Sequence, residues 1–201
     1  MTRRIALFGG TFDPIHRGHT TVAAAAAQQI GAERLIFIPA RISPLKGFFP
    51  FARDIDRLRM IELAVAGHPE FVVSDCELQR PAPSYTLDTV QQFQRDYGPG
   101  TAIHWLLGAD SVNDLVHWYR IEELIDACHL TTMRRPGYEP DFDRFVSRWG
   151  PQRVAKLQQD AIVTPLVDIS STEVRRRLAA GEDVRDLLHP EVVRYIREHH
   201  L

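Results

Sequence analysis

The sequence predicts an α/β protein with a doubly wound parallel sheet, in which helices cover both faces of the sheet and make three layers. Two observations predict it. Short apolar runs alternate along the chain with segments of helical spacing, which is the order of parallel βαβ units. The first apolar run also ends in a glycine pair that leads toward an alanine-rich segment, as a strand-to-helix turn requires. We expect residues 1–201 to form one domain, whose last part, about 165–201, is helical.

The first half of the chain supplies two strands and two helices. Residues 5–8 (IALF) are a buried strand that ends at glycines. Alanine is the best helix former, so 18–30 is expected to be a helix, and Gly31 stops it. The apolar run 35–39 is the second strand and ends at a proline. Residues 57–67 have apolar side chains at helical spacing and a closing glycine, which predicts the second helix.

The second half repeats this alternation. Residues 71–78 (FVVSDCEL) are expected to be a strand, and 86–97 a helix. A strand over 102–107 then ends at a glycine. The helical pattern of 121–128 precedes a strand over 129–135, which ends at a Pro-Gly pair.

Three further segments have no clear period. We expect 138–160 to be helical, although its aromatic and charged residues are mixed. The stretches 43–51 and 79–85 are irregular and contain prolines. Because parallel sheets bind ligands beyond the carboxyl ends of their strands, these two loops are candidate ligand loops.

Composition and charge narrow the class of protein. The net charge of −2 shows no excess of positive charge of the kind that binds nucleic acid or an anionic membrane. Cys76 and Cys128 are isolated and form no metal-binding spacing, which fits a reducing compartment. No apolar run approaches the roughly 20 residues of a membrane span, and the N-terminus lacks a signal-peptide pattern. We therefore expect a cytoplasmic protein with small-molecule partners.

The turn after the first strand reads GGTFDPIHRGH over residues 9–19. A glycine turn that feeds a helix is suited to bind phosphate, because helix N-terminal N–H groups favour anions. The turn has neither the G-x-G-x-x-G pattern nor the lysine of a phosphate-binding loop. Instead, His16 and His19 flank Gly18 where the helix should begin, and imidazoles can donate to phosphate oxygens. Two alternatives stay open: metal ligation together with Asp13, or ordinary surface or capping histidines.

Downstream, the segment ISSTEVRRRL (169–178) has its own helix start. Ser170 and Glu173 have the spacing of a capping box, so a helix is expected to begin there. Arg175 would lie in the first turn of that helix, close to a phosphate bound at its end. Arg176 and Arg177 are expected on a solvated helix face.

These segments carry a specific resemblance. GGTFDPIHRGH and ISSTEVRRRL resemble the two signatures of the adenylyltransferase branch of the nucleotidyltransferase superfamily. The segments PSYTLDT (83–89) and WLLGADSVNDLVHWYRIEEL (105–124) resemble elements of the bacterial nicotinate mononucleotide adenylyltransferases. Together with RMIELA and RRPG, they follow one another in the family's order over almost the whole chain. The resemblance implies a Rossmann-like nucleotidyltransferase fold.

The resemblance also implies a reaction and a set of residues. The reaction is adenylyl transfer from ATP to nicotinate mononucleotide, with Mg²⁺ accompanying ATP and no metal ligands from protein side chains. The implied catalytic residues are His16, His19, Lys46 and Arg175. The implied ATP-binding residues are Gly9, Gly10, Thr11, Phe12, His19, Gly108, Asp110, Ser170, Ser171, Thr172 and Arg175. The implied mononucleotide-binding residues are Lys46, Tyr85, Thr86, Trp118 and Tyr119; core packing is the alternative role for Trp118.

One position departs from the family pattern. The loop after the second strand usually has a histidine before its lysine, and here Leu45 precedes Lys46. Leucine cannot donate to phosphate, so that contact is lost or comes from Lys46 or Ser43. Arg57 and Arg59 are expected on a solvated helix face.

Three alternatives differ from this function: another acceptor, nucleotide binding without catalysis, and hydrolysis. Nicotinamide mononucleotide differs from the acid by one group, so it remains an alternative acceptor, whereas PSYTLDT argues against phosphopantetheine. A non-catalytic nucleotide-binding protein on the same fold is the alternative from another class. A serine or cysteine hydrolase is set aside, because the chain lacks G-x-S-x-G and an activated cysteine.

Overall fold

A computed structural model describes residues 2–45, 49–134, 137 and 139–201. Within these residues, six strands form one parallel sheet in the order β3-β2-β1-β4-β5-β6. The strands are β1 (Arg3–Gly10), β2 (Arg34–Pro39), β3 (Phe71–Val73), β4 (Thr101–Gly108), β5 (His129–Arg134) and β6 (Ile162–Val163). The doubly wound parallel sheet expected from the alternating pattern is confirmed.

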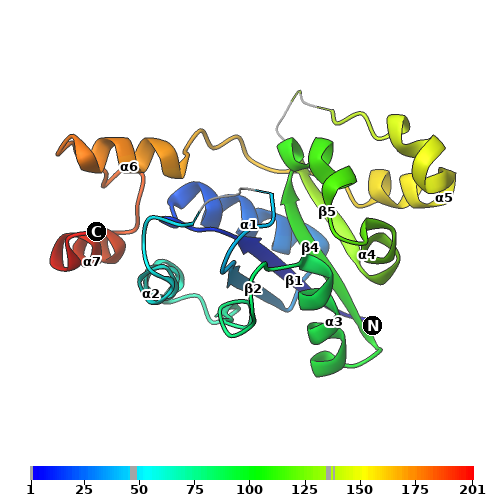
Figure 1. Cartoon of the computed structure of the whole chain (residues 1–201), viewed down its shortest axis with the longest axis horizontal. Helices are drawn as coiled ribbons and strands as arrows, with labels where there is room; N and C mark the ends of the chain where they lie inside the picture. The colour runs from blue at the N-terminus through cyan, green and yellow to red at the C-terminus, as the bar shows by residue number, and fades with distance from the viewer. Residues whose placement is uncertain (1, 46–48, 135–136, 138) are drawn as a thin grey trace.

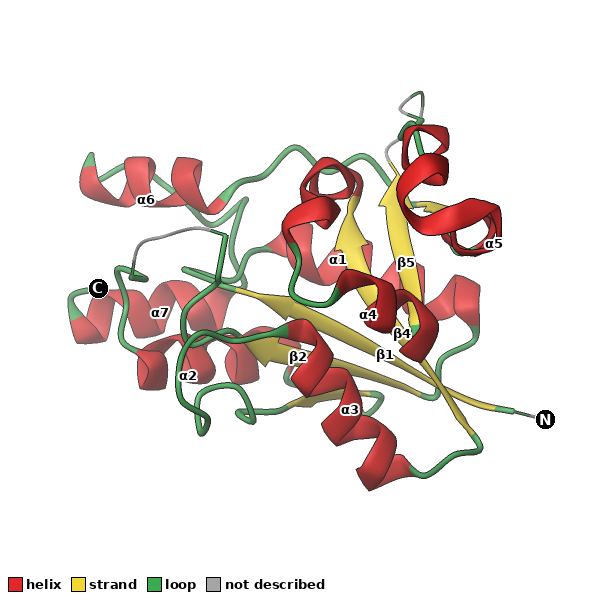
Figure 2. Cartoon of the chain, turned by 45° about the vertical axis from the view of Figure 1, so that its right-hand side comes forward, coloured by secondary structure: helices red, strands yellow, loops and turns green. Residues whose placement is uncertain are grey.

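Helices cover both faces of this twisted sheet (Figure 2). The α-helices are α1 (Arg17–Ile30), α2 (Asp54–Val65), α3 (Thr86–Tyr97), α4 (Ile121–Ala127), α5 (Val146–Gln159), α6 (Ser171–Ala179) and α7 (Pro190–His199). The described residues also form the 3₁₀ segments η1 (Ala109–His117) and η2 (Asp143–Phe145). In Figure 1, α6 and α7 lie at one end of the molecule and α5 at the other.

Each face of the sheet has its own hydrophobic core. Alternate residues of β1 point to opposite faces, so Ile5 and Leu7 pack with α3, α4 and α5. Ala6 and Phe8 pack on the other face, with α1, α2 and α7. The described side chains therefore form the three layers that the sequence predicted.

The structure corrects three element boundaries. The strand expected over 71–78 ends at Val73, because the chain then turns, with the N–H of Leu78 donating to the carbonyl of Asp75 at 2.8 Å. The segment after β4 forms η1, where no helix was expected from the sequence. The helix expected within 138–160 runs over α5 but is broken at Gly150, whose φ of +79° departs from helical values.

The strand order reverses between β1 and β4, which lie side by side at the centre of the sheet. Their carboxyl ends, at Gly10 and Gly108, open the crevice where α/β sheets of this kind bind ligands. Among the described residues, no helix is both long and apolar enough to cross a lipid bilayer.

Candidate active site

A cavity of about 960 Å³ lies beyond the carboxyl ends of β1 and β4. Its walls come from the turn after β1, the end of β4 with η1, the start of α3 and the start of α6. Every predicted site residue that the structure describes lines it: Gly9, Gly10, Thr11, Phe12, His16, His19, Tyr85, Thr86, Gly108, Asp110, Trp118, Tyr119, Ser170, Ser171, Thr172 and Arg175. Lys46 lies outside the described residues. Ser43 and Leu45, from the loop with the family departure, also line the cavity.

The turn after β1 needs its glycines for space. A Cβ on Gly9 would lie 2.4 Å from the ring of Trp105, and one on Gly10 would lie 2.9 Å from the ring of Phe12. Phe12 itself has a φ of +47°, in the left-handed region that few side chains adopt. The chain is thus tightly folded at the point where its backbone borders the cavity.

His16 and His19 cap α1 reciprocally. The Nδ1 atom of His16 accepts from the N–H of His19 at 3.3 Å, and the Nδ1 atom of His19 accepts from the N–H of His16 at 3.2 Å. Their rings stack with centroids 3.6 Å apart. A Cβ on Gly18 would lie 3.0 Å from Nδ1 of His16, so the glycine leaves room for this stack. The capping alternative is therefore correct in part, because both histidines cap the helix and line the cavity.

The cap also sets which ring nitrogen carries the proton when an imidazole is neutral. Because each Nδ1 accepts a backbone N–H, a neutral ring must carry its proton on Nε2, which is then a donor. Burial lowers the pKa of His16 to about 4, so this ring is neutral at pH 7 when no anion is bound. His16 is thus a neutral hydrogen-bond donor rather than a fixed positive charge.

The carboxylate of Asp13 is committed to the backbone. Its Oδ2 accepts from the N–H of Phe51 at 2.7 Å, and its Oδ1 accepts from the N–H of Ala52 at 3.1 Å. Both Asp13 oxygens and both histidine Nδ1 atoms thus bond to the backbone, and these contacts give the metal alternative no support. Across residues 2–45, 49–134, 137 and 139–201, no group of three or more His, Cys, Asp or Glu could hold a metal ion.

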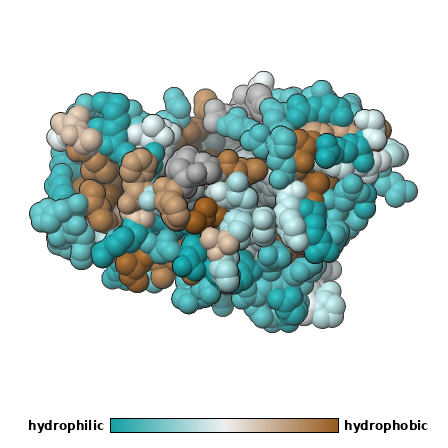
Figure 3. Space-filling model, viewed as in Figure 1, coloured by the Kyte–Doolittle hydropathy of each residue, from teal (hydrophilic) through white to brown (hydrophobic). Residues whose placement is uncertain are grey.

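Arg175 joins α6 to the turn after β1. Its guanidinium donates from Nη1 to the carbonyl of Asp13 at 2.6 Å and lies 4.6 Å from the ring centroid of Phe51. The hydroxyl of Ser171 donates to the carbonyl of Pro14 at 3.0 Å. Phe51 is 75% exposed. Figure 3 shows apolar side chains gathered between α2 and α6. These two hydrogen bonds hold α6 against the turn after β1.

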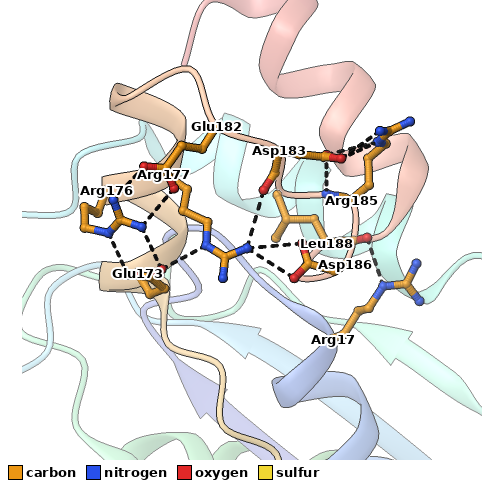
Figure 4. Close-up of polar contacts among 9 residues, drawn as sticks. All are labelled: Arg17, Glu173, Arg176, Arg177, Glu182, Asp183, Arg185, Asp186 and Leu188. Carbon is orange, nitrogen blue, oxygen red and sulfur yellow. Dashed lines mark hydrogen bonds and ion pairs between the residues drawn. The ribbon is translucent and has the colours of Figure 1, made fainter.

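Two expectations about α6 need correction. The Ser170 hydroxyl accepts from the N–H of Glu173 at 3.1 Å, as a cap should. Within the described chain, however, the Glu173 carboxylate does not complete a capping box but pairs with Arg176 and Arg177 (Figure 4). Arg175 is the fifth residue of α6 and therefore lies beyond its first turn.

The opposite wall of the cavity is aromatic. The rings of Tyr85 and Tyr119 stack with centroids 4.3 Å apart, and Tyr119 is 44% exposed. Trp118 lines the cavity and also packs against the core beneath α3 and α4, so core packing is confirmed and mononucleotide binding stays a prediction. Its Nε1 is buried and has no hydrogen-bond partner in the described part of the protein.

Sequence reasoning missed two buried charged residues beside the cavity. Arg57 was expected in solvent, but its side chain is 0% exposed and Nη1 donates to the carbonyl of Thr11 at 2.7 Å. Arg59 is exposed, as expected, and pairs with Glu62. Glu77 accepts from the hydroxyl of Thr89 at 2.6 Å, and burial raises the pKa of its carboxyl. Nothing in the local pattern marks either residue, because their burial depends on segments distant in the sequence.

A family model described as cytidylyltransferase-like matches residues 7–177. The chain is 41% identical to a probable nicotinate-nucleotide adenylyltransferase of Yersinia pestis, over 95% of this chain and 91% of that protein. It is 39% identical to the protein of that name in Pectobacterium atrosepticum, over 98% of this chain and 97% of that protein. It is 37% identical to that of a Synechococcus strain, over 99% of this chain and 94% of that protein.

Solved structures show the same fold. The nicotinic acid mononucleotide adenylyltransferase of Plasmodium falciparum, complexed with NaAD, superposes with a TM-score of 0.74 at 19% identity, covering 99% of this chain and 97% of that one. The same protein complexed with APC gives a TM-score of 0.69 at 20% identity, covering 99% of this chain and 96% of that one. The architecture is therefore shared even where most residues differ.

Proposed function

The chain belongs to the cytidylyltransferase-like family and, within it, to the nicotinate-nucleotide adenylyltransferases, and we propose that it transfers the adenylyl group of ATP to nicotinate mononucleotide. The products are nicotinate adenine dinucleotide and pyrophosphate, in a step of NAD biosynthesis. The observation that carries the proposal is the reciprocal histidine cap of His16 and His19, which borders a cavity at the switch point of the sheet.

The reaction joins two anions and needs alignment more than proton removal. A 5′-phosphate oxygen of the mononucleotide attacks the α-phosphorus of ATP, the bond from that phosphorus to the β-phosphate oxygen breaks, and pyrophosphate leaves with its electron pair. The attacking oxygen is already ionised at neutral pH, so no strong general base is required. The protein contributes by holding both phosphates in line and by stabilising charge that develops at the α-phosphate.

The ATP half of the site is assigned to the turn after β1, the end of β4 and the start of α6. The Nε2–H groups of His16 and His19 are the donors for the α-phosphate. Arg175 supplies a fixed positive charge beside them, since it is held by the Asp13 carbonyl. Gly108 and Asp110 border the adenosine side, where the family contacts the ribose. Lys46, on the loop that carries Leu45, remains a proposed phosphate contact.

The mononucleotide half is assigned to α3 and the aromatic wall. Tyr85 is the N-cap of α3, and within the described residues its side chain makes no capping hydrogen bond. The first N–H groups of α3, beginning at Thr86, are therefore suited to bind the nicotinate carboxylate. Trp118 and Tyr119 offer planes on which a pyridine ring can stack. A neutral amide would gain less at this helix N-terminus than a carboxylate.

Mg²⁺ is expected to arrive with ATP, whose triphosphate charge it neutralises. The residues present fit that role, because Asp110 and Asp114 line the cavity without forming a cage of their own. When phosphates bind Mg²⁺, the ion keeps several waters and needs only one or two protein carboxylates. A cavity wall with Asp110 and Asp114 is sufficient for that. We also propose a cytoplasmic location, since both thiols are buried and free and both substrates are intracellular metabolites.

Product analysis tests the proposal. Incubation with ATP, Mg²⁺ and nicotinate mononucleotide should yield the dinucleotide and pyrophosphate in equal amounts, detected by mass spectrometry and a pyrophosphate-coupled assay. Omitting the mononucleotide should abolish pyrophosphate release. No dinucleotide, with ATP still bound, would favour the non-catalytic nucleotide-binding protein instead.

A further inference from the structure

Arg57 combines full burial with a contact to the turn after β1. Its guanidinium, on α2, donates from Nη1 to the Thr11 carbonyl at 2.7 Å and from Nη2 to Oδ1 of Asp54 at 2.6 Å. Its Nε is buried and has no hydrogen-bond partner among the residues that the structure describes. Asp54 is 42% exposed, so water solvates much of the counter-charge. A buried cation is thus fixed by one backbone carbonyl of the candidate site and by one surface carboxylate.

Stability alone does not call for this arrangement. Replacing a buried ion pair by an apolar side chain of similar volume is often neutral or stabilising, because two charges no longer have to leave water. The unpaired Nε–H adds a further cost, since it loses its hydrogen bond to water on folding. The contact to Thr11 therefore points to a role beyond packing.

The geometry of the Thr11–Phe12 peptide suggests that role. The described cis bonds are Asp13–Pro14 and Ala82–Pro83, so this peptide is trans and its N–H points opposite to its carbonyl. Holding the Thr11 carbonyl against α2 therefore directs the N–H of Phe12 away from that helix. The ring of Phe12 meets the ring of His19 edge-on, with centroids 5.1 Å apart. The hydrogen bond from Arg57 to the Thr11 carbonyl thus fixes the direction of the Phe12 N–H, and the Phe12 ring supports the ring of His19.

We propose that Arg57 is a positioning residue for adenylyl transfer. By holding the Thr11 carbonyl, it orients the N–H of Phe12 and the ring of His19 toward the α-phosphate of ATP. This inference rests on the proposed function, because it assigns Arg57 to the ATP half of the same site. Arg57 acts through its neighbours, since its own guanidinium is enclosed by protein. A misplaced turn would still bind substrates but would align them poorly, so turnover falls more than affinity.

The test compares Arg57→Met with Arg59→Met. Methionine keeps much of the side-chain volume but cannot donate, and Arg59 is an exposed arginine on the same helix. Steady-state pyrophosphate release should show kcat of Arg57→Met lowered by about 10–100-fold, as expected for a small misplacement of reacting groups. The KM for nicotinate mononucleotide should stay close to that of the unchanged protein, and Arg59→Met should match the unchanged protein in both. Arg57→Lys should recover part of kcat, because an ammonium can still donate to Thr11.

Each outcome decides the inference. A folded Arg57→Met protein with kcat within about twofold of the unchanged protein, far less than misalignment should cost, would overturn it and leave Arg57 as a structural residue. If Arg57→Met does not fold, Asp54→Ala decides, because it removes one exposed partner of the guanidinium. Its kcat should fall in a protein that circular dichroism shows to be folded, although loss of the counter-charge lowers its unfolding temperature. An unchanged kcat would overturn the inference. Loss of the proposed function would look different, since the unchanged protein would then release no pyrophosphate.

Discussion

His16 caps α1 and is proposed to donate to substrate phosphate, and substitution can separate these two contributions. Its Nδ1 caps α1 by accepting the N–H of His19, and this leaves the ring proton on Nε2 as a donor for substrate phosphate. His16→Asn keeps a side-chain acceptor at the N-cap but loses the imidazole. His16→Ala loses both. The two variants therefore share the catalytic defect and differ in the cap.

The expected magnitudes follow from these two losses. Asparagine is among the best N-cap residues and alanine among the worst, so the free energy of unfolding should differ between the variants by about 1 kcal/mol. The lost donor to developing charge should lower kcat of both variants by about 10²–10³, equivalent to about 2.7–4 kcal/mol of transition-state stabilisation. The neutral form of His16 at pH 7 makes this a loss of a hydrogen bond rather than of a charge.

Urea unfolding and steady-state pyrophosphate release measure the two effects on the same samples. The unfolding free energies should rank the unchanged protein above His16→Asn, and His16→Asn above His16→Ala. If His16→Asn restored kcat to within about tenfold of the unchanged protein, less than the loss of one preorganised donor costs, the imidazole would be a cap and no more, and the reasoning would be refuted.

Three further outcomes are expected. Trp118→Ala should raise the KM for the mononucleotide and leave that for ATP unchanged; an effect confined to ATP would contradict the assignment of the aromatic wall. Burial lowers the pKa of His16 and His104 from 6.5 to about 4, so the unfolded chain binds more protons between those pH values and stability falls as the pH falls. From pH 8 to pH 5 the two should together cost about 4 kcal/mol in urea unfolding, and a flat profile would contradict this. Burial raises the pKa of the Cys128 thiol to about 12 and also raises that of Cys76, so a thiol reagent should label neither until the protein unfolds; rapid labelling of the native protein would contradict their burial.

The alternation of strands and helices was predictable because it is a local signal. Buried parallel strands are apolar on both faces, and a run such as 5–8 shows this directly. The strand expected over 71–78 ends early, at Val73, because the chain then forms a turn in which the N–H of Leu78 donates to the carbonyl of Asp75. The two residues of β6 were too few to show any period.

The residues that line the candidate site were predictable where they belong to motifs with a fixed order along the chain. They were less predictable where contacts between distant segments decide whether a side chain is buried. The resemblance identified the residues around the cavity, although their roles in catalysis remain predictions. The spacing of His16 and His19 did not show that the rings cap each other, because histidine is not a usual capping residue. Arg57 looked like any exposed helix arginine, and its burial depends on Thr11, 46 positions away in the sequence.

The acceptor preference tests the central claim most directly. We would measure pyrophosphate release from ATP and Mg²⁺, with nicotinate mononucleotide and nicotinamide mononucleotide as parallel acceptors. A hydrogen bond to a charged group contributes about 1.5–3 kcal/mol, so kcat/KM should favour the acid by about 10–100-fold. Equal rates, or a preference for the amide, would contradict the assignment of a carboxylate site at the start of α3, and no release with either acceptor would contradict the proposed reaction itself.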